Sequence, residues 1–346
     1  MARHFLVLGL VGFAATVQAC NPACTFRQTV SLPENLPLRQ SMLRTAMGDM
    51  CTQLKNRNAP LKMSADSPIT GRFYPNQCQA TGDDNLNLSF AGYGYAWTNV
   101  TKKVTFTGTA AAGFHYDFKV PETGDCDIYA YFRAFRVDSA TFTTHRLESA
   151  LATAFNGQAF GDTFGKQTLN QKLQDGFTVI AHGGEPSNTE VALGIVPVGQ
   201  KPFHPYQWTK GDGKVTYEND RTEVHQNQRD FVGPIVVEEN KRALYVQAKL
   251  DGAPAVDVLV MRKADAESAL QAYFEMPTAS TMPGMPLASD VLSAGKAMQR
   301  TIVVPAGTYY VVFDNTSSAG QTMPVVNALD DRAAVINYLI QIGDAP

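Results

Sequence analysis

Hydrophobic and small or polar positions alternate with a period of two in the segment LNLSFAGYGYAWTNV, residues 86–100. Side chains along a strand point in turn to its two faces, so this period predicts a β-strand. One face carries Tyr93, Tyr95 and Trp97, opposite a face of glycine and alanine. We expect the aromatic face to pack beneath a helix. The alternative is a platform on which a sugar or another flat ligand stacks, and it makes these three aromatic residues the candidate ligand-binding residues.

The alternation continues in the segments that follow. In GFHYDFKV, Phe114, Tyr116 and Phe118 fall on one face, with His115 and Lys119 on the other, a pattern typical of a sheet with one solvated face. The next segment, CDIYAYFRAFRV, is apolar on both faces and therefore predicts a central strand covered on each side. A half-exposed antiparallel sheet is the expected result.

Helical spacing of apolar residues appears in the segment RQSMLRTAMGDMCTQL, which predicts a short amphipathic helix that Cys51 would fix to the body. A second helix is predicted to begin near Arg146. The segment after it repeats glycine every four residues, at 157, 161 and 165, and we interpret it as a loop with glycine-permitted turns. Residues 168–181 predict another short helix that runs into a strand.

The last third of the chain holds short strand-like runs separated by Gly, Pro, Asp or Ser. The runs are ALYVQAKLDG, AVDVLVM, RTIVVPAG, TYYVVFDN and AVINYLIQIGD. Such spacing predicts an antiparallel β-sandwich. The polar stretch TYENDRTEVHQNQRD precedes these runs, and we interpret it as surface or linker with a domain boundary near residue 225.

Within the predicted sandwich, the segment VVPAGTYYVVFDN resembles the closing hairpin of pre-peptidase C-terminal-type and related jelly-roll modules of secreted bacterial proteins. The resemblance covers this hairpin and the strand layout of residues 230–346. It implies a noncatalytic module that binds or positions. The matched residues shape the turn and the strand, so the resemblance assigns no functional residue.

The N-terminus carries a short basic start at Arg3 and His4, and an apolar run of residues 5–17 follows. This run is shorter than the ~20 residues that span a bilayer, so it predicts a signal peptide. The segment Val17-Gln18-Ala19-Cys20 resembles the bacterial lipobox, which implies a lipid attached to Cys20 and an anchor in a membrane. The alternative is ordinary signal-peptidase cleavage that leaves Cys20 as a plain thiol.

The cysteine count favours lipid attachment. The chain has five cysteines, and Cys20 apart, an even set remains: Cys24, Cys51, Cys78 and Cys126. An even set suits two disulfides in an oxidising compartment, and four cysteines allow three pairings that remain open. The spacing contains no C-x-x-C pair and no neighbouring histidine, so we expect no metal site.

These patterns together predict a mainly β protein with an α+β N-terminal domain and a C-terminal antiparallel β-sandwich. The expected divisions are a signal peptide at 1–19, a lipidated tether at 20–40, a disulfide-stapled α+β domain at 41–225, and a sandwich domain at 226–346.

Charge and motifs exclude several functions. The net charge is −3, which leaves no basic excess for nucleic acid. The acidic residues Asp212, Glu218, Asp220 and Glu223 lack the ligand spacing of an EF-hand, and we interpret them as a solvated acidic face. The chain has no G-x-S-x-G, H-E-x-x-H or P-loop motif, so we expect neither an enzyme nor a cofactor.

Two functional hypotheses follow. In the first, the chain is a noncatalytic, lipid-anchored protein of the bacterial envelope, expected at the outer membrane, that binds or scaffolds another envelope protein or a glycan. In the second, the N-terminal domain wraps its apolar strands around a hydrophobic ligand and acts as an envelope carrier. We favour the first, because buried strands account for the aromatic residues without a ligand.

Overall fold

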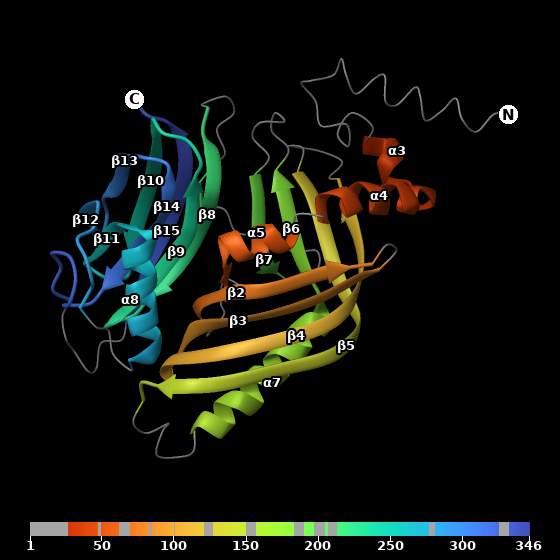
Figure 1. The fold of residues 1–346 in the computed structure, drawn as a ribbon, viewed down its shortest axis with the longest axis horizontal. Helices are drawn as coiled ribbons and strands as arrows, with labels where there is room; N and C mark the ends of the chain where they lie inside the picture. The colour runs from red at the N-terminus through yellow and green to blue at the C-terminus, as the bar shows by residue number, and fades with distance from the viewer. Residues whose placement is uncertain are drawn as a thin grey trace.

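The structure is a computed structural model that describes residues 27–47, 50–61, 70–82, 85–99, 101–120, 127–149, 157–182, 190–196, 205–206, 213–276, 281–324 and 332–346. Within these ranges the chain forms one seven-stranded and two four-stranded antiparallel sheets, with helices around them (Figure 1). The predicted fold class, mainly β with an α+β N-terminal part and a C-terminal sandwich, is confirmed.

The seven-stranded sheet is a meander in which each strand pairs with its neighbours in sequence. Its strands are β1 (Ala59–Pro60), β2 (Thr70–Thr81), β3 (Leu86–Thr98), β4 (Lys102–Lys119), β5 (Asp127–Leu147), β6 (Phe177–His182) and β7 (Glu190–Val196). The predicted alternation is confirmed, because Phe114, Tyr116 and Phe118 are buried while His115 and Lys119 are exposed. β4 and β5 are long and curve across the sheet (Figure 1).

The N-terminal segment is helical where the structure describes it. It forms α3 (Arg27–Ser31), a 3-10 turn η1 (Pro33–Asn35), α4 (Leu36–Met47) and α5 (Met50–Arg57). The helix predicted from the methionine-rich segment is confirmed as α4 and α5. The irregular tether expected at 20–40 is wrong from Arg27 on, because Arg39 on α4 is buried and donates from Nε to Asp117 Oδ1 at 2.7 Å. This ion pair holds α4 against β4.

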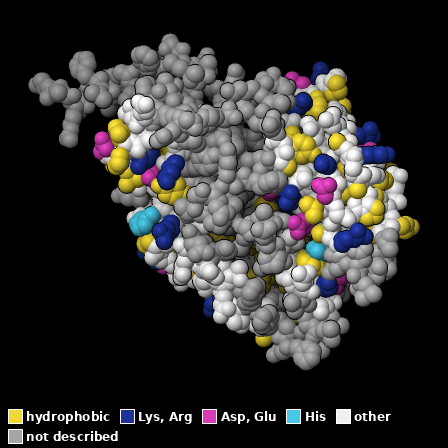
Figure 2. Space-filling model, turned by 180° about the vertical axis from the view of Figure 1, so that it is seen from behind, with side chains coloured by type: hydrophobic (Ala, Val, Ile, Leu, Met, Phe, Trp, Pro, Cys, Tyr) yellow, Lys and Arg dark blue, Asp and Glu magenta, His cyan; other side chains and the backbone are white. Residues whose placement is uncertain are grey.

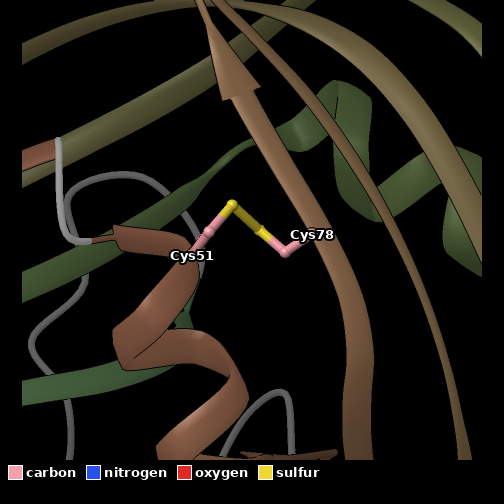
Figure 3. The surroundings of a disulfide bond; sticks show 2 residues. All are labelled: Cys51 and Cys78. Carbon is pink, nitrogen blue, oxygen red and sulfur yellow. A yellow bond between two sulfur atoms is a disulfide. The ribbon is translucent and has the colours of Figure 1, made fainter.

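A disulfide joins Cys51 on α5 to Cys78 on β2 (Figure 3). This bond is one of the pairings that the sequence left open, and it fixes α5 on the sheet. Cys20, Cys24 and Cys126 lie outside the described residues. With Cys51 and Cys78 joined, Cys24 and Cys126 are the remaining pair of the predicted set.

Helix α7 (Gly157–Asp175) replaces the loop that we predicted from its glycines. A Cβ atom at Gly161 would lie 2.7 Å from Thr144 Oγ1, and one at Gly165 would lie 2.4 Å from a ring carbon of Phe142. The four-residue repeat therefore lets one helix face approach β5 closely. The helix predicted to begin near Arg146 is also wrong at its start, because β5 continues through Leu147; residues 150–156 lie outside the described residues.

The C-terminal sandwich consists of two sheets, with strand orders β13-β10-β15-β8 and β12-β11-β14-β9. The strands are β8 (Val215–Val224), β9 (Gln228–Val237), β10 (Arg242–Asp251), β11 (Ala255–Arg262), β12 (Ala288–Ser293), β13 (Ala297–Val304), β14 (Gly307–Asn315) and β15 (Ala334–Asp344). The buried core draws Val, Leu and Ile from both sheets. The five predicted runs are confirmed as strands, while α8 (Lys263–Glu275), β8, β9 and β12 were not predicted.

The polar stretch at 216–230 is not a linker, and the interpretation of its acidic residues as a solvated face is wrong for Glu218 and Asp220. β8 pairs with β15, so the sandwich begins before the expected boundary near residue 225. Glu218 and Asp220 pair in register with Ile340 and Tyr338, which face the core. These carboxylates therefore lie on the inner side of an edge strand.

We expect Gly165→Ala to destabilise the fold by ~1 to 3 kcal/mol, because the added methyl group overlaps the Phe142 ring although alanine favours helix. The measurement is urea unfolding followed by circular dichroism. Lys166→Ala, at an exposed position of the same helix, is the control and should change stability by less than ~0.5 kcal/mol. Equal stability of the two variants would contradict the close contact of α7 with β5.

Candidate functional site at the junction of sheet and sandwich

The candidate site lies where the seven-stranded sheet meets the open edge of the sandwich. β8 and β9 are the edge strands of the two sandwich sheets on this side. β2 lies against both of them, and Tyr95 of β3 reaches β9. We call this region the junction and define it by Arg72 of β2, Tyr95 of β3, Glu218 of β8, Asp230 of β9 and Tyr338 of β15. The five side chains meet although they come from distant parts of the chain.

Arg72 is the centre of the junction. Its side chain is 1% exposed and donates from Nε to Asp230 Oδ1 at 2.8 Å and from Nη2 to Asp230 Oδ2 at 2.6 Å. Nη1 donates to Glu218 Oε1 at 3.1 Å, and Nη2 donates to the Tyr338 hydroxyl at 3.2 Å. The Tyr338 hydroxyl in turn donates to Glu218. One guanidinium of the N-terminal sheet thereby joins strands of both sandwich sheets.

Asn58 connects the junction to the disulfide-fixed helix. It follows α5 directly, adopts a positive φ of 45° and is 2% exposed. Its Oδ1 accepts from Arg72 Nη1 at 2.7 Å, and its Nδ2 donates to the carbonyl oxygen of Gly233 on β9. Asparagine tolerates this left-handed backbone better than most residues. The end of α5 is thus held by both parts of the protein.

The predicted aromatic stripe faces the junction. The Tyr95 hydroxyl donates to Asp230 Oδ1 at 2.7 Å and accepts from the Phe231 amide at 2.9 Å. Its ring meets Tyr273 of α8 edge to face, with 5.3 Å between centroids. The expectation that this face packs beneath a helix therefore holds for Tyr95.

The other two members of the stripe also have protein partners. Trp97 is 6% exposed and stacks on His225 with 3.3 Å between ring centroids. Tyr93 stacks on Tyr74 at 5.4 Å and meets Phe274 of α8 edge to face at 5.7 Å. Protein side chains cover faces of these rings that a flat ligand would need.

The glycine face of β3 is covered by phenylalanine rings. Phe73 and Phe106 pair in register with Gly94 on its two sides. A Cβ atom at Gly94 would lie 2.8 Å from the Phe106 ring, and one at Gly92 would lie 2.6 Å from the Phe73 ring. Phe106 also stacks on Phe142, which contacts α7. The glycines therefore make room for rings of the protein itself.

The pKa values of Asp230 in the junction and of Asp220 beside it shift in opposite directions, because their charged neighbours differ. Burial alone would raise the pKa of Asp230, but the charge of Arg72 and the hydrogen bonds from Arg72 and Tyr95 lower it below its usual range. Burial and the neighbouring charge of Glu218 raise the pKa of Asp220 to about 7. Asp230 therefore keeps its charge while Asp220 takes up a proton near neutral pH.

A second group of buried charges adjoins the first. Arg229 on β9 forms an ion pair with Asp314 on β14, and both side chains are fully buried. Lys103 on β4 is 2% exposed and donates from Nζ to the carbonyl oxygens of Tyr273 at 3.0 Å and Met276 at 2.7 Å, at the C-terminal end of α8. Burial lowers the pKa of Lys103 to about 8. The charge of Glu148 opposes this shift, and the charge of Arg229 adds to it. The Lys103 ammonium lies 3.8 Å from the centroid of the Tyr273 ring and within reach of the charge of Arg229.

The charged residues of the junction were missed because they lie in segments that look polar or irregular in sequence. Asp230 and Glu218 were part of the presumed linker, and the segment containing Arg72 was not predicted as a strand. A usable signal existed in TGRFYP, where Arg72 and Tyr74 alternate with other residues like a strand face. The aromatic stripe, in contrast, was found from its period alone.

The described surface shows mixed chemistry. Figure 2 shows basic and acidic side chains interspersed with hydrophobic ones on the face opposite to that of Figure 1. In the described ranges, no group of three or more His, Cys, Asp or Glu is placed to hold a metal ion. No described helix has the length and apolar character needed to cross a membrane.

Comparison with known proteins adds no family. No protein-family model matches the chain, and no curated protein matches it. One solved structure that aligns with the chain is a glycoside hydrolase family 43 arabinoxylan arabinofuranohydrolase from Bacillus subtilis in complex with cellotetraose. The identity is 9%, the TM-score is 0.24, and the alignment covers 78% of this chain and 53% of that one. The chain thus spans about half the length of that protein, and a TM-score this low supports no inference.

We expect Arg72→Met to destabilise the protein by ~3 to 5 kcal/mol, because it leaves Asp230 and Glu218 buried without their cation. Urea unfolding at pH 7 measures this change. The control is Arg300→Met, which removes an ion pair with Asp290 whose arginine is 55% exposed, and it should cost less than ~1 kcal/mol. A similar cost for both variants would show that the junction pair contributes no more than a surface pair.

The proton on Asp220 predicts a pH dependence of stability. The carboxyl keeps its proton up to about pH 7 in the folded state but loses it near pH 4 when unfolded, so its contribution to stability falls as pH rises through this window. Through Asp220, the wild type should lose about 2 to 4 kcal/mol of unfolding free energy between pH 4 and pH 8, and Asp220→Asn should not show this loss. The exposed Asp138→Asn is the control. Because burial also raises the pKa of Glu148, the stability of Asp220→Asn should still fall slightly as pH rises. Parallel stability curves for Asp220→Asn and the wild type would contradict the prediction.

Proposed function

We propose that this chain is a noncatalytic, lipid-anchored protein of the bacterial envelope, held at the outer membrane through Cys20, that binds or scaffolds another envelope protein or a glycan. The proposal combines an address, given by the lipobox-like segment, with a rigid body that carries a sandwich. The resemblance of residues 303–315 to secreted jelly-roll modules supports the noncatalytic role.

The cysteine pairing carries the proposal. The disulfide between Cys51 and Cys78 suits an oxidising compartment such as the bacterial envelope. It uses two of the four cysteines that remain when Cys20 is set aside. Cys24 and Cys126 complete that even set, so Cys20 is the cysteine without a predicted sulfur partner. Such a cysteine directly after Val17-Gln18-Ala19 fits a site of lipid attachment.

The sandwich has a second edge for a partner. The N-terminal sheet covers the edge formed by β8 and β9, whereas β12 and β13 form the edge on the far side of the sandwich (Figure 1). Val291 on β12 is 40% exposed and Val303 on β13 is 61% exposed. Edge strands with exposed apolar side chains can accept a strand or a loop of another protein. This edge favours a protein over a glycan as the partner.

The carrier hypothesis has less support from the described residues. A carrier needs an apolar face that a ligand can reach. Here Phe106 stacks on both Phe73 and Phe142, and α7 lies against Phe142. Side chains of the chain itself therefore occupy space that a hydrophobic ligand would use.

Cys20→Ser should move the protein from the membrane to the soluble envelope fraction, because several acyl chains hold a protein to a bilayer persistently and a serine accepts none. Fractionation followed by immunoblotting measures the change, and intact mass of the membrane-extracted wild type should show the added lipid. Cys24→Ser, four residues later, is the matched control and should stay in the membrane. Membrane retention of Cys20→Ser would overturn the anchor.

Solvent extraction separates the scaffold from the carrier. We expect an organic extract of the purified Cys20→Ser protein, analysed by mass spectrometry, to contain no stoichiometric lipid. Bovine serum albumin, a lipid-binding protein extracted in parallel, is the control for recovery. A lipid recovered at about one molecule per chain would favour the carrier over the scaffold.

A further inference from the structure

A small cavity lies beside the junction, between the two parts of the protein. Its lining includes Thr70 of β2, Trp97 of β3, Lys103 of β4, Arg229 of β9 and Tyr273 of α8. It has room for about one particle of the size of a water molecule. Elements of the sheet and of the sandwich both contribute to its wall.

Two buried polar atoms of the lining residues have no hydrogen-bond partner within the part of the chain that the structure describes: Arg229 Nη1 and Thr70 Oγ1. The other guanidinium nitrogens of Arg229 are engaged, Nε with Asp314 and Nη2 with Thr316 at 3.2 Å and Ser318 at 2.9 Å. Leaving a charged donor buried without a partner is costly. Both Arg229 Nη1 and the Thr70 hydroxyl can donate, so two of the residues that line the cavity have an open donor for an acceptor.

The open donor belongs to a buried guanidinium, and an ionised donor binds a negative acceptor more strongly than a neutral one, although the lining as a whole carries two cations and two carboxylates. Arg229 and Lys103 both line it, and the charge of Arg229 disfavours the charged form of Lys103, whereas that of Glu148 favours it. The lining also includes the carboxylates Glu223 and Asp230, but both oxygens of Asp230 are bonded to Arg72 and one also accepts from Tyr95. A negative charge between the two cations would offset their repulsion where burial weakens screening by water.

We propose that this cavity binds a monovalent, single-atom anion, chloride under ordinary conditions, between Arg229 Nη1, the Thr70 hydroxyl and the Lys103 ammonium. The ion links β2 and β4 of the sheet to β9 of the sandwich. Its binding stabilises the folded chain and couples the stability of the junction to the chloride concentration. This site is independent of the lipid anchor at Cys20.

The test uses the Cys20→Ser chain in buffers of constant ionic strength in which sodium chloride replaces sodium gluconate. Above the dissociation constant of the ion, the unfolding equilibrium constant should fall about tenfold for each tenfold rise in chloride. Thr70→Val removes the hydroxyl at nearly constant volume and should weaken chloride binding at least threefold, while Thr70→Ser should retain it. Equal stability in chloride and gluconate overturns the proposal and leaves water as the occupant.

A crystal soaked in bromide locates the ion without any variant. An anomalous peak in contact with Arg229 Nη1 and Thr70 Oγ1 supports the proposal. Bromide found only at the surface identifies an adventitious ion and overturns it. A chloride response that Thr70→Val leaves unchanged also overturns it, because the ion would then bind elsewhere.

Discussion

The buried ion pair between Arg72 and Asp230 is the interaction on which the arrangement of this protein depends. The two residues lie 158 positions apart and bring together a meander sheet and a sandwich. Either charge alone would be buried at large cost, so each part of the protein requires the other. Glu218, Tyr338 and Asn58 satisfy the remaining donors of Arg72. The sheet and the sandwich are therefore expected to unfold together rather than as separate domains.

The tyrosines make this polar junction compatible with an apolar interior. Tyr95 contributes a ring to the packing against α8 and a hydroxyl to Asp230. Tyr74 adds a second hydroxyl, which lies 3.2 Å from that of Tyr95 and donates to the carbonyl oxygen of Phe231 at 2.7 Å. A phenylalanine at either position would keep the apolar contact but leave a polar partner unsatisfied. The aromatic stripe thus forms the surface through which the seven-stranded sheet packs against α8 and the sandwich.

The sequence predicts those parts of the fold in which apolar side chains are buried and polar side chains are exposed. The strands within 86–120 alternate, because one side of each is apolar and packed, and the C-terminal runs are recognised as apolar segments between turn residues. Prediction fails where charged or polar side chains are buried. Glu218 and Asp230 look like solvated residues, and only the distant Arg72 makes their burial possible. The loop expected at 157–165 fails for a related reason, since a local pattern cannot show that Thr144 and Phe142 require glycines opposite them.

The junction also determines what a lipid anchor at Cys20 would achieve. Arg39 fixes α4 to β4, the disulfide fixes α5 to β2, and Asn58 at the end of α5 binds both Arg72 and β9. A continuous series of buried contacts thus runs from the N-terminal helices to the sandwich. A chain anchored at its N-terminus would hold the β12–β13 edge in a fixed position relative to the first helices instead of on a flexible linker. Such rigidity suits a scaffold, because a partner docked on that edge pays no entropy for ordering the two parts.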